Sequence, residues 1–406
     1  MIKKILLSLC LFTGLLSFAQ EGSSSPYSFY GIGEVRFKGT AEVRSMGGIA
    51  VEQDSIHINL ENPASFSSLK LTSFAVGGTY NSTTLKDESK SEKASRTTLD
   101  YLAVGLPLGK FGVGFGLIPY SSLGYKIQTT ADDNSANSTT MTSTGGLNKV
   151  FMGVGYKITP KLSVGADFNY NFGVIKIINS ELNSNVVSGT RETNTSKLSG
   201  VNFNVGTMYQ TKLNKKLSLF SSLNYTLAND LNATNDRVIE TSSEVNNVEQ
   251  PDEKISFASR ISVSAGIGQA KKWLIGGRLV YQEASDWSNS YNKSANATYG
   301  TYGSASLGGY YIPDYNSFTN YAKRIVYRGG LKFERTGLII NSESIDNMGV
   351  TLGLGLPITG SFSNINIGLE LGKRGTTSSG LIQENYANIS VGMSLNDKWF
   401  EKRKFN

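Results

Sequence analysis

The sequence predicts an all-β protein, a 14-stranded antiparallel transmembrane β-barrel, and three observations carry this prediction. Apolar and polar residues alternate with a period of two along most of the chain. The segments that alternate are joined by connections that are alternately long and short. Charged residues make up only 17% of the chain, whereas a soluble domain typically carries about 25%.

The alternation recurs from residue 69 to residue 396. In the segment 388–395, Ile, Val, Met and Leu occupy the odd positions, while Asn, Ser and Gly occupy the even ones. The segment 162–173 has the opposite phase, and 255–267 shows a similar pattern with Ile255 and Ile261 on one face. We mark about fourteen such segments, most of them near the roughly 9–11 residues that a tilted strand needs to cross a bilayer.

The connections between these segments support a barrel independently. Tight turns are expected at 108–110, 159–161, around Asn214 and at 271–272. In outer-membrane barrels short turns face the periplasm and long loops face outward, so an even strand number places both termini in the periplasm. The connection 313–321 is long for a turn, and 336–344 is short for a loop. The long polar connections are expected at 81–96, 128–145, 177–197, 229–254 and 287–303.

The N-terminus indicates export. Lys3 and Lys4 precede the apolar stretch 5–16, and Ser17-Phe18-Ala19 offers a cleavage site between small residues. We therefore expect residues 1–19 to be a signal peptide, since the apolar stretch is short for the alternative, an N-terminal transmembrane anchor. Cys10, the one cysteine of the chain, would leave with it. The remaining chain could form no disulfide and no Cys-based metal site.

The composition of the two strand faces distinguishes a barrel from a large soluble β-sandwich. The polar face is mostly Ser, Asn, Gly and Thr, which suits a lumen, whereas a sandwich needs a strongly charged outer face. Aromatic residues near strand ends are expected to form the interfacial girdles of a membrane barrel. These residues are Tyr80, Tyr101, Tyr120, Tyr156, Trp273, Trp287, Tyr321, Trp399 and Phe400.

Residues 20–68 do not alternate cleanly and contain two short motifs. The first runs from Arg44 to Ala50 and reads R-S-M-G-G-I-A, and the second is Asn62-Pro63-Ala64. Adjacent glycines allow close backbone packing, and a proline fixes φ at a rigid turn, although ordinary turn chemistry would use the same residues. With these motifs the sequence resembles the FadL-type family of outer-membrane barrels, which includes transporters of long-chain fatty acids and aromatic hydrocarbons and PorV-like barrels of protein secretion.

This resemblance implies a fourteen-stranded barrel with an N-terminal hatch in its lumen. The expected organisation is a hatch over 20–68, a barrel over 69–396 and a periplasmic tail over 397–406. The segments 354–357, 372–376 and 398–400 also look like a subgroup of the family, and either Phe400 or Phe405 could serve as the terminal aromatic. The hatch motif residues are Met46, Gly47, Gly48, Asn62, Pro63 and Ala64.

Little in the chain points to catalysis. His57 is the only histidine and falls in the expected hatch, far from an outer rim where a barrel enzyme would act. We therefore expect no enzyme, no metal site and no cofactor. Without Lys3 and Lys4 the chain has 37 cationic residues against 32 acidic ones. This excess is mild for the size and gives no reason to expect nucleic-acid binding.

Ionisable residues on the predicted lumen face are the candidate ligand site. A midplane Arg or Lys on the lipid face costs about 2–4 kcal/mol, so these residues should point inward. They could bind an anionic head group beside an apolar pocket, but an ion-pair network that holds the hatch is the favoured interpretation. The residues are Arg260, Arg278, Arg328, Lys332, Glu334, Glu370 and Asp167.

Two classes of function follow. A barrel in contact with outer-membrane lipid could take up or bind a hydrophobic small molecule, fatty-acid-like or aromatic and weakly anionic. Alternatively, it could be a scaffold without transport that binds protein partners in outer-membrane secretion or assembly. An apolar pocket between hatch and wall would favour the first class, and a sealed lumen would favour the second.

Overall fold

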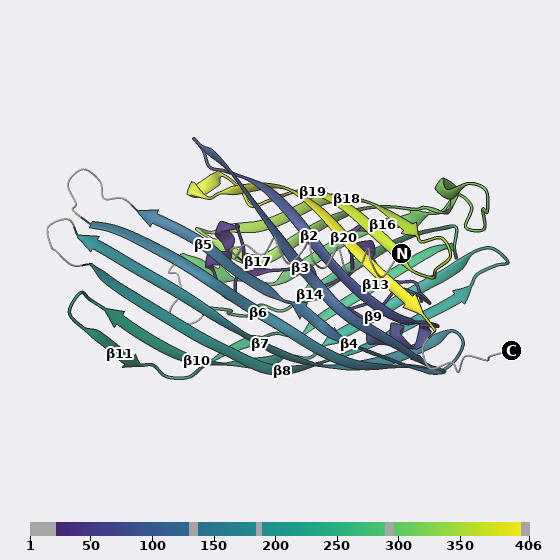
Figure 1. The fold of residues 1–406 in the computed structure, drawn as a ribbon, viewed down its shortest axis with the longest axis horizontal. Coiled ribbons are helices and arrows are strands. Elements are labelled where there is room, and N and C mark those ends of the chain that lie inside the picture. The colour runs from purple at the N-terminus through teal and green to yellow at the C-terminus, as the bar shows by residue number, and fades with distance from the viewer. Residues whose placement is uncertain (1–21, 130–136, 184–188, 289–295, 399–406) are drawn as a thin grey trace.

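The computed structural model describes residues 22–129, 137–183, 189–288 and 296–398. They form a closed antiparallel barrel of fourteen wall strands, which confirms the predicted fold class (Figure 1). The last strand, β20 (Gln383–Asp397), pairs with the first wall strand, β2 (Thr72–Lys86), along its whole length. The expected signal peptide, the predicted girdle residue Trp399 and the candidate terminal aromatics Phe400 and Phe405 lie outside the described residues.

Four of the wall strands are interrupted and therefore count as two elements each. In order after β2, the wall consists of β3 (Ser91–Leu108), β4 (Phe111–Pro119) with β5 (Ser121–Thr129), β6 (Asn137–Lys157), β7 (Leu162–Asn183), β8 (Thr190–Lys212), β9 (Ser218–Thr226) with β10 (Asn229–Glu240), β12 (Glu253–Phe257) with β13 (Arg260–Gln269), β14 (Trp273–Gln282), β15 (Ala297–Tyr299) with β16 (Tyr302–Tyr311), β17 (Val326–Ile340), β18 (Glu343–Pro357), β19 (Asn364–Arg374) and β20.

The remaining elements are short. The segment before β2 contains η1 (Pro26–Phe29), β1 (Glu34–Val35), α2 (Ala41–Arg44) and η2 (Pro63–Ser68), and connections contain β11 (Val245–Glu249), η3 (Tyr321–Arg324) and η4 (Ser378–Gly380). Across the described parts of the chain, no helix is long and apolar enough to span a bilayer.

The strands on one side of the barrel extend well into stretches that the sequence predicted as loops. β6, β7 and β8 have 21, 22 and 23 residues, whereas β14 has 10. Figure 1 shows these long strands and the β10–β11 hairpin reaching past their neighbours. The loops predicted at 128–145, 177–197 and 229–254 were therefore too long, because strands occupy most of their described residues. Beyond the lipid both faces of a strand can be polar, so the alternation that reveals a strand disappears.

The two connections that did not match the predicted lengths have simple explanations. Between β17 and β18 the chain reverses at Asn341 and Ser342, whose φ angles of 51° and 66° form a tight hairpin turn. Positive φ at both central residues is the geometry that matches the strand twist. Between β16 and β17, residues 312–325 form an ordered connection that includes η3.

Three residues predicted for the aromatic girdles point into the barrel instead. Tyr101 and Tyr120 are buried, with 2% and 8% exposure, and Trp287 packs beside an interior cluster. The register between β2 and β3 shifts by one residue next to Tyr101, because Gly77 pairs with Tyr101 but Gly78 pairs with Leu99. Such a bulge reverses the side-chain direction. Tyr120 lies at the break between β4 and β5.

A second break changes the phase of the strand predicted over 255–268. Ile255 is 2% exposed and faces inward, whereas Ile261 is 38% exposed and faces outward. Both were predicted on one face. The interruption between β12 and β13 at residues 258–259 resets the alternation, since it separates two segments with different partners.

Candidate lumen site

The N-terminal segment contacts two wall arginines through Glu34 of β1. The Glu34 carboxylate lies 2.6 Å from Arg96 Nη2 of β3 and 2.8 Å from Arg374 Nη1 of β19, and Ser23 Oγ donates to it at 2.7 Å. Arg374 also lies 3.4 Å from Glu384 of β20. Burial acts to raise the pKa of Glu34, but the two guanidinium groups outweigh it and hold the pKa far below its usual range.

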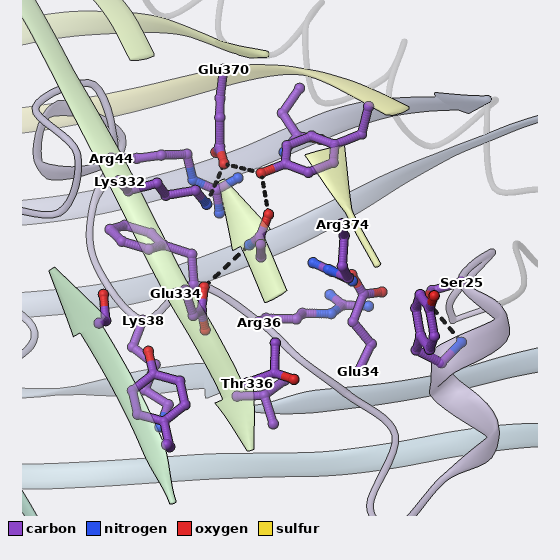
Figure 2. Close-up of a pocket in the computed structure, with 18 of the residues that line it drawn as sticks. Ser25, Glu34, Arg36, Lys38, Arg44, Lys332, Glu334, Thr336, Glu370 and Arg374 are labelled. Carbon is purple, nitrogen blue, oxygen red and sulfur yellow. Dashed lines mark hydrogen bonds and ion pairs between the residues drawn. The ribbon is translucent and has the colours of Figure 1, made fainter. Parts of the chain in front are cut away.

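A second network of polar side chains joins β17 to β20 inside the barrel (Figure 2). Lys332 forms a close ion pair with Glu370, which also lies 3.1 Å from the Tyr386 hydroxyl. That hydroxyl is 2.8 Å from Asn347 Oδ1, and Asn347 Nδ2 donates to Glu334 at 3.2 Å. Three of the predicted lumen residues thus lie in one connected network within the wall.

The other predicted residues lie in three further places. Arg278 forms a close ion pair with Glu61 of the N-terminal segment and donates to Gly48 O at 3.1 Å, and Arg260 lies 3.8 Å from the same carboxylate. Asp167 accepts from Asn204 at 2.9 Å. Arg328 donates to Asn366 at 2.9 Å and does not line the chamber with Arg260 and Arg278. The structure therefore brings together two of the three arginines.

These networks surround a cavity of about 220 Å³. Its lining is rich in charge, and β1 and the residues after it contribute Glu34, Arg36 and Lys38 (Figure 2). Sequence reasoning did not select these three residues, because the segment before β2 has no alternation that would give their direction. Lys38 Nζ donates to the Tyr120 hydroxyl at 2.9 Å, and burial lowers the pKa of Lys38 well below its usual value.

Apolar layers lie on both sides of this charged cavity. We call the end of the barrel with the short turns, such as 109–110, the turn end, and the opposite end the loop end. Along β6, Phe151 belongs to an apolar cluster at the turn end, Lys149 lines a polar cavity, and Leu147 belongs to a cluster at the loop end. The loop-end cluster includes Ile32 of the N-terminal segment, and the turn-end cluster includes Phe66. The N-terminal segment therefore contributes apolar side chains above and below the charges.

The R-S-M-G-G motif packs backbone against backbone at the end of α2. Gly47 and Gly48 have φ angles of 69° and 96°, a region that favours glycine. Gly47 N donates to Thr351 Oγ1 at 3.0 Å, and a Cβ at Gly48 would lie 3.0 Å from Arg278 Nη1. The backbone of Met46 lies directly against β16 and β17, where glycines leave the space.

The Asn62-Pro63-Ala64 motif fastens η2 to four neighbouring strands. Asn62 Oδ1 accepts from Ala64 N at 3.0 Å, and its amide nitrogen lies 3.1 Å from Thr207 O and 2.8 Å from Ser222 Oγ. Pro63 lies against Gly155 and Gly165 of β6 and β7. This motif thus holds η2 to the wall without charges, through hydrogen bonds and through close packing against the wall glycines; we call it the neutral anchor.

The wall opens between β3 and β5. β3 pairs with β4 only over Leu102–Leu108, while β5 pairs with β6 and with β1 of the N-terminal segment. The upper part of β3 and β5 are therefore unpaired with one another. Arg36 bridges this gap, since Nε donates to Ser122 Oγ at 3.2 Å and Nη1 donates to Leu99 O at 3.4 Å.

His57 lies near the turn end with acidic neighbours. Its Nδ1 is 2.7 Å from Asp54 Oδ2. Burial acts to lower the pKa of His57, but Asp54 outweighs it and raises the pKa. Across the described residues, His, Cys, Asp and Glu form no group of three that could hold a metal ion.

The closed barrel with an N-terminal segment packed inside is the FadL-like outer-membrane fold, as the sequence resemblance predicted. The toluene transporter TbuX of Ralstonia pickettii has a TM-score of 0.60 at 14% identity, covering 88% of this chain and 98% of that one. A FadL homologue of Pseudomonas aeruginosa reaches 0.57 at 10% identity, covering 89% and 98%. The Pseudomonas putida toluene transporter TodX reaches 0.53 at 15% identity, with the same coverage. These identities establish the fold alone.

The chain belongs to the family described as BamG, which it matches over residues 1–406. No curated protein matches the sequence.

Proposed function

We propose that this protein is a scaffold barrel of the outer membrane, which binds protein partners in secretion or assembly and keeps its lumen closed. The observation that carries the proposal is the use of lumen charges to hold the N-terminal segment. Glu34 and Glu61 each engage two wall arginines. Breaking a buried ion pair by removing one partner costs about 3–5 kcal/mol, so these contacts oppose movement of the segment.

The cavity is poorly suited to an apolar ligand. Ligand pockets are mostly apolar and span roughly 300–1,000 Å³, whereas this cavity measures about 220 Å³ and is lined by ion pairs. Arg278 and Arg260 already face Glu61, so a ligand carboxylate would have to compete with it. Such an arrangement supports the ion-pair network as the role of the predicted lumen residues.

The side of the barrel with the long strands β6, β7 and β8 offers a surface for protein partners. β10 and β11 form a hairpin whose second strand is exposed along its whole length.

We propose further that residues 1–19 are a removed signal peptide, that residues 20–68 serve as the hatch, and that the short turns face the periplasm, as in other barrels of this type.

The test combines purification and permeability. Purified in mild detergent from its native membranes, the barrel should retain other outer-membrane proteins in fixed ratio. Deleting residues 241–252, which comprise β11 and the connections on either side of it, should release them. In planar bilayers the intact barrel should show no ion conductance, whereas a variant lacking residues 25–60 should conduct ions. A barrel that purifies alone with bound fatty acid would refute the scaffold proposal.

Uptake of a hydrophobic, fatty-acid-like or aromatic molecule is the second candidate. The gap between β3 and β5 favours it, because a cavity of about 400 Å³ lies there, lined by Leu99, Pro119 and Val174 among others. Three solved barrels of the same fold are described as toluene transporters or a FadL homologue. Saturable binding of a fluorescent fatty acid or of labelled toluene, with an affinity or rate that changes when Arg36→Ala removes the bridge across the gap, would establish this function. Absence of binding would reject it.

A further inference from the structure

The connection between β16 and β17, residues 312–325, differs from the other connections at its end of the barrel. The others described there are shorter, from 109–110 between β3 and β4 to 358–363 between β18 and β19. The connection 312–325 instead carries η3 and stands off the barrel at the end where the C-terminus lies (Figure 1). We call residues 312–325 together with Lys271 and Lys272 the basic aromatic loop.

The loop exposes aromatic side chains to an unusual degree. Phe318 is 98% exposed, and Tyr315 and Tyr321 are 46% and 43% exposed. Exposed apolar side chains that gather in one place mark interaction or membrane-contact sites, whereas scattered single ones do not.

The exposed rings continue a row of aromatics on the lipid-facing wall. Trp273 of β14 pairs with Tyr311 of β16, which pairs with Tyr327 of β17. Tryptophan and tyrosine gather where a bilayer meets water. Tyr327 faces outward, and its hydroxyl donates to Ala322 O at 3.2 Å. This bond places η3 over the outer perimeter of the wall, where lipid would lie.

The loop also concentrates positive charge next to its rings. It carries four cationic side chains against one carboxylate, Asp314. Lys271 Nζ is 4.6 Å from the centre of the Tyr315 ring, and Arg324 Cζ is 5.2 Å from the centre of the Tyr321 ring. Cations beside aromatic rings match the negative headgroups and the apolar boundary of an anionic leaflet.

The loop is ordered before it meets a partner. Asp314 N donates to Lys323 O at 2.8 Å, Ala322 N donates to Asn320 Oδ1 at 3.0 Å, and the Tyr321 hydroxyl donates to Pro357 O at 3.1 Å. Docking would therefore require little ordering of the backbone, which favours association.

We propose that the basic aromatic loop docks on anionic phospholipid headgroups of the leaflet next to this end of the barrel, with Phe318 inserted below them. Continuity with the lipid-facing aromatic row favours a lipid surface over a protein partner. This inference goes beyond the scaffold proposal and does not depend on it, since its test contains no protein partner.

The test uses a fluorescent label at the tip of the loop. The chain after Cys10 has no cysteine, so Phe318→Cys can be labelled alone with an environment-sensitive dye. Lys215→Cys, on the exposed turn between β8 and β9, is the matched control. Both are reconstituted in vesicles of phosphatidylcholine alone or with phosphatidylglycerol, and folding is checked by resistance to detergent unfolding.

The Phe318→Cys label should shift to the blue and be quenched by lipid-borne quenchers, about twofold more with phosphatidylglycerol. K323Q together with R324Q should remove that difference, and the Lys215→Cys label should report water in both vesicles. A Phe318→Cys label as water-exposed as the control would overturn the proposal and leave a protein as the occupant of the loop. Insertion that does not respond to phosphatidylglycerol or to K323Q with R324Q would overturn the headgroup recognition.

Discussion

The N-terminal segment is fastened to the barrel wall in two contrasting ways. Near the loop end, the Glu34 carboxylate is held between the guanidinium groups of Arg96 and Arg374. Near the turn end, Asn62 and Pro63 are held by neutral hydrogen bonds and by wall glycines. A charged anchor is expensive to break because it leaves charges buried, whereas a closely packed anchor is sensitive to added volume.

Breaking the charged anchor should have the largest effect. Glu34→Ala leaves two mostly buried guanidinium groups without their shared carboxylate, and we expect a loss of about 3–5 kcal/mol in the free energy of unfolding. Urea unfolding of the barrel in vesicles, followed by tryptophan fluorescence, would measure it. Glu92→Ala, at an exposed position of β3, is the matched control. A loss below about 1 kcal/mol would mean that the anchor is not what holds the segment.

A half-buried carboxyl, that of Glu52, lies between Glu34 and Asn62 in the sequence and should make stability depend on pH. Burial is the largest cause that raises the pKa of Glu52 from 4.5 to about 7, although the Tyr310 hydroxyl donates to it at 2.7 Å. Because the folded pKa is raised, the contribution of Glu52 is fully present below 4.5 and is lost as pH rises through about 7. The loss across this window is on the order of 3 kcal/mol.

Glu52→Gln should remove this slope, because the amide stays neutral throughout. The difference between the unfolding free energies of the wild type and the variant, measured from pH 4 to 8, isolates the Glu52 contribution from that of His57. Parallel pH profiles would show that Glu52 ionises freely in the folded barrel.

Adding volume at the neutral anchor should have a moderate effect. A Cβ at Gly165 would lie 2.4 Å from Ala64 N and 2.5 Å from Pro63 C, which are backbone atoms that cannot rotate away. We expect Gly165→Val to destabilise the barrel by about 1–3 kcal/mol. Gly303→Val is the control, since nothing lies within 4 Å of its Cβ position. Equal unfolding midpoints for the two variants would contradict close packing at the motif.

An ion pair outside the lumen should contribute least. Lys197 Nζ lies 3.0 Å from Asp236, but the two side chains are 62% and 55% exposed. Water screens such a pair, so Lys197→Ala should change the unfolding free energy by less than about 1 kcal/mol. An effect as large as that of Glu34→Ala would mean that burial does not distinguish the two kinds of ion pair.

The strands that could be predicted are those in contact with lipid. Lipid requires apolar side chains on one face, and the lumen accepts Ser, Asn and Gly on the other, so the segment 388–395 carries its own direction. This signal disappears above the bilayer, where the upper part of β8 is polar on both faces. It also fails at local irregularities, such as the bulge beside Tyr101, because a single extra residue reverses every later side chain.

The sequence by itself determined the class of the protein, since the lipid environment leaves a periodic pattern in every wall strand and the motifs around Gly47 and Pro63 are local. Only the tertiary structure decided how the lumen charges pair. Arg374 and Glu34 are 340 residues apart, and Arg278 and Glu61 are 217 apart. Alternation can show that a charged side chain of a wall strand points inward. The partner of that charge depends on how the barrel closes and on the path of the segment before β2, and no periodic pattern in the sequence encodes either.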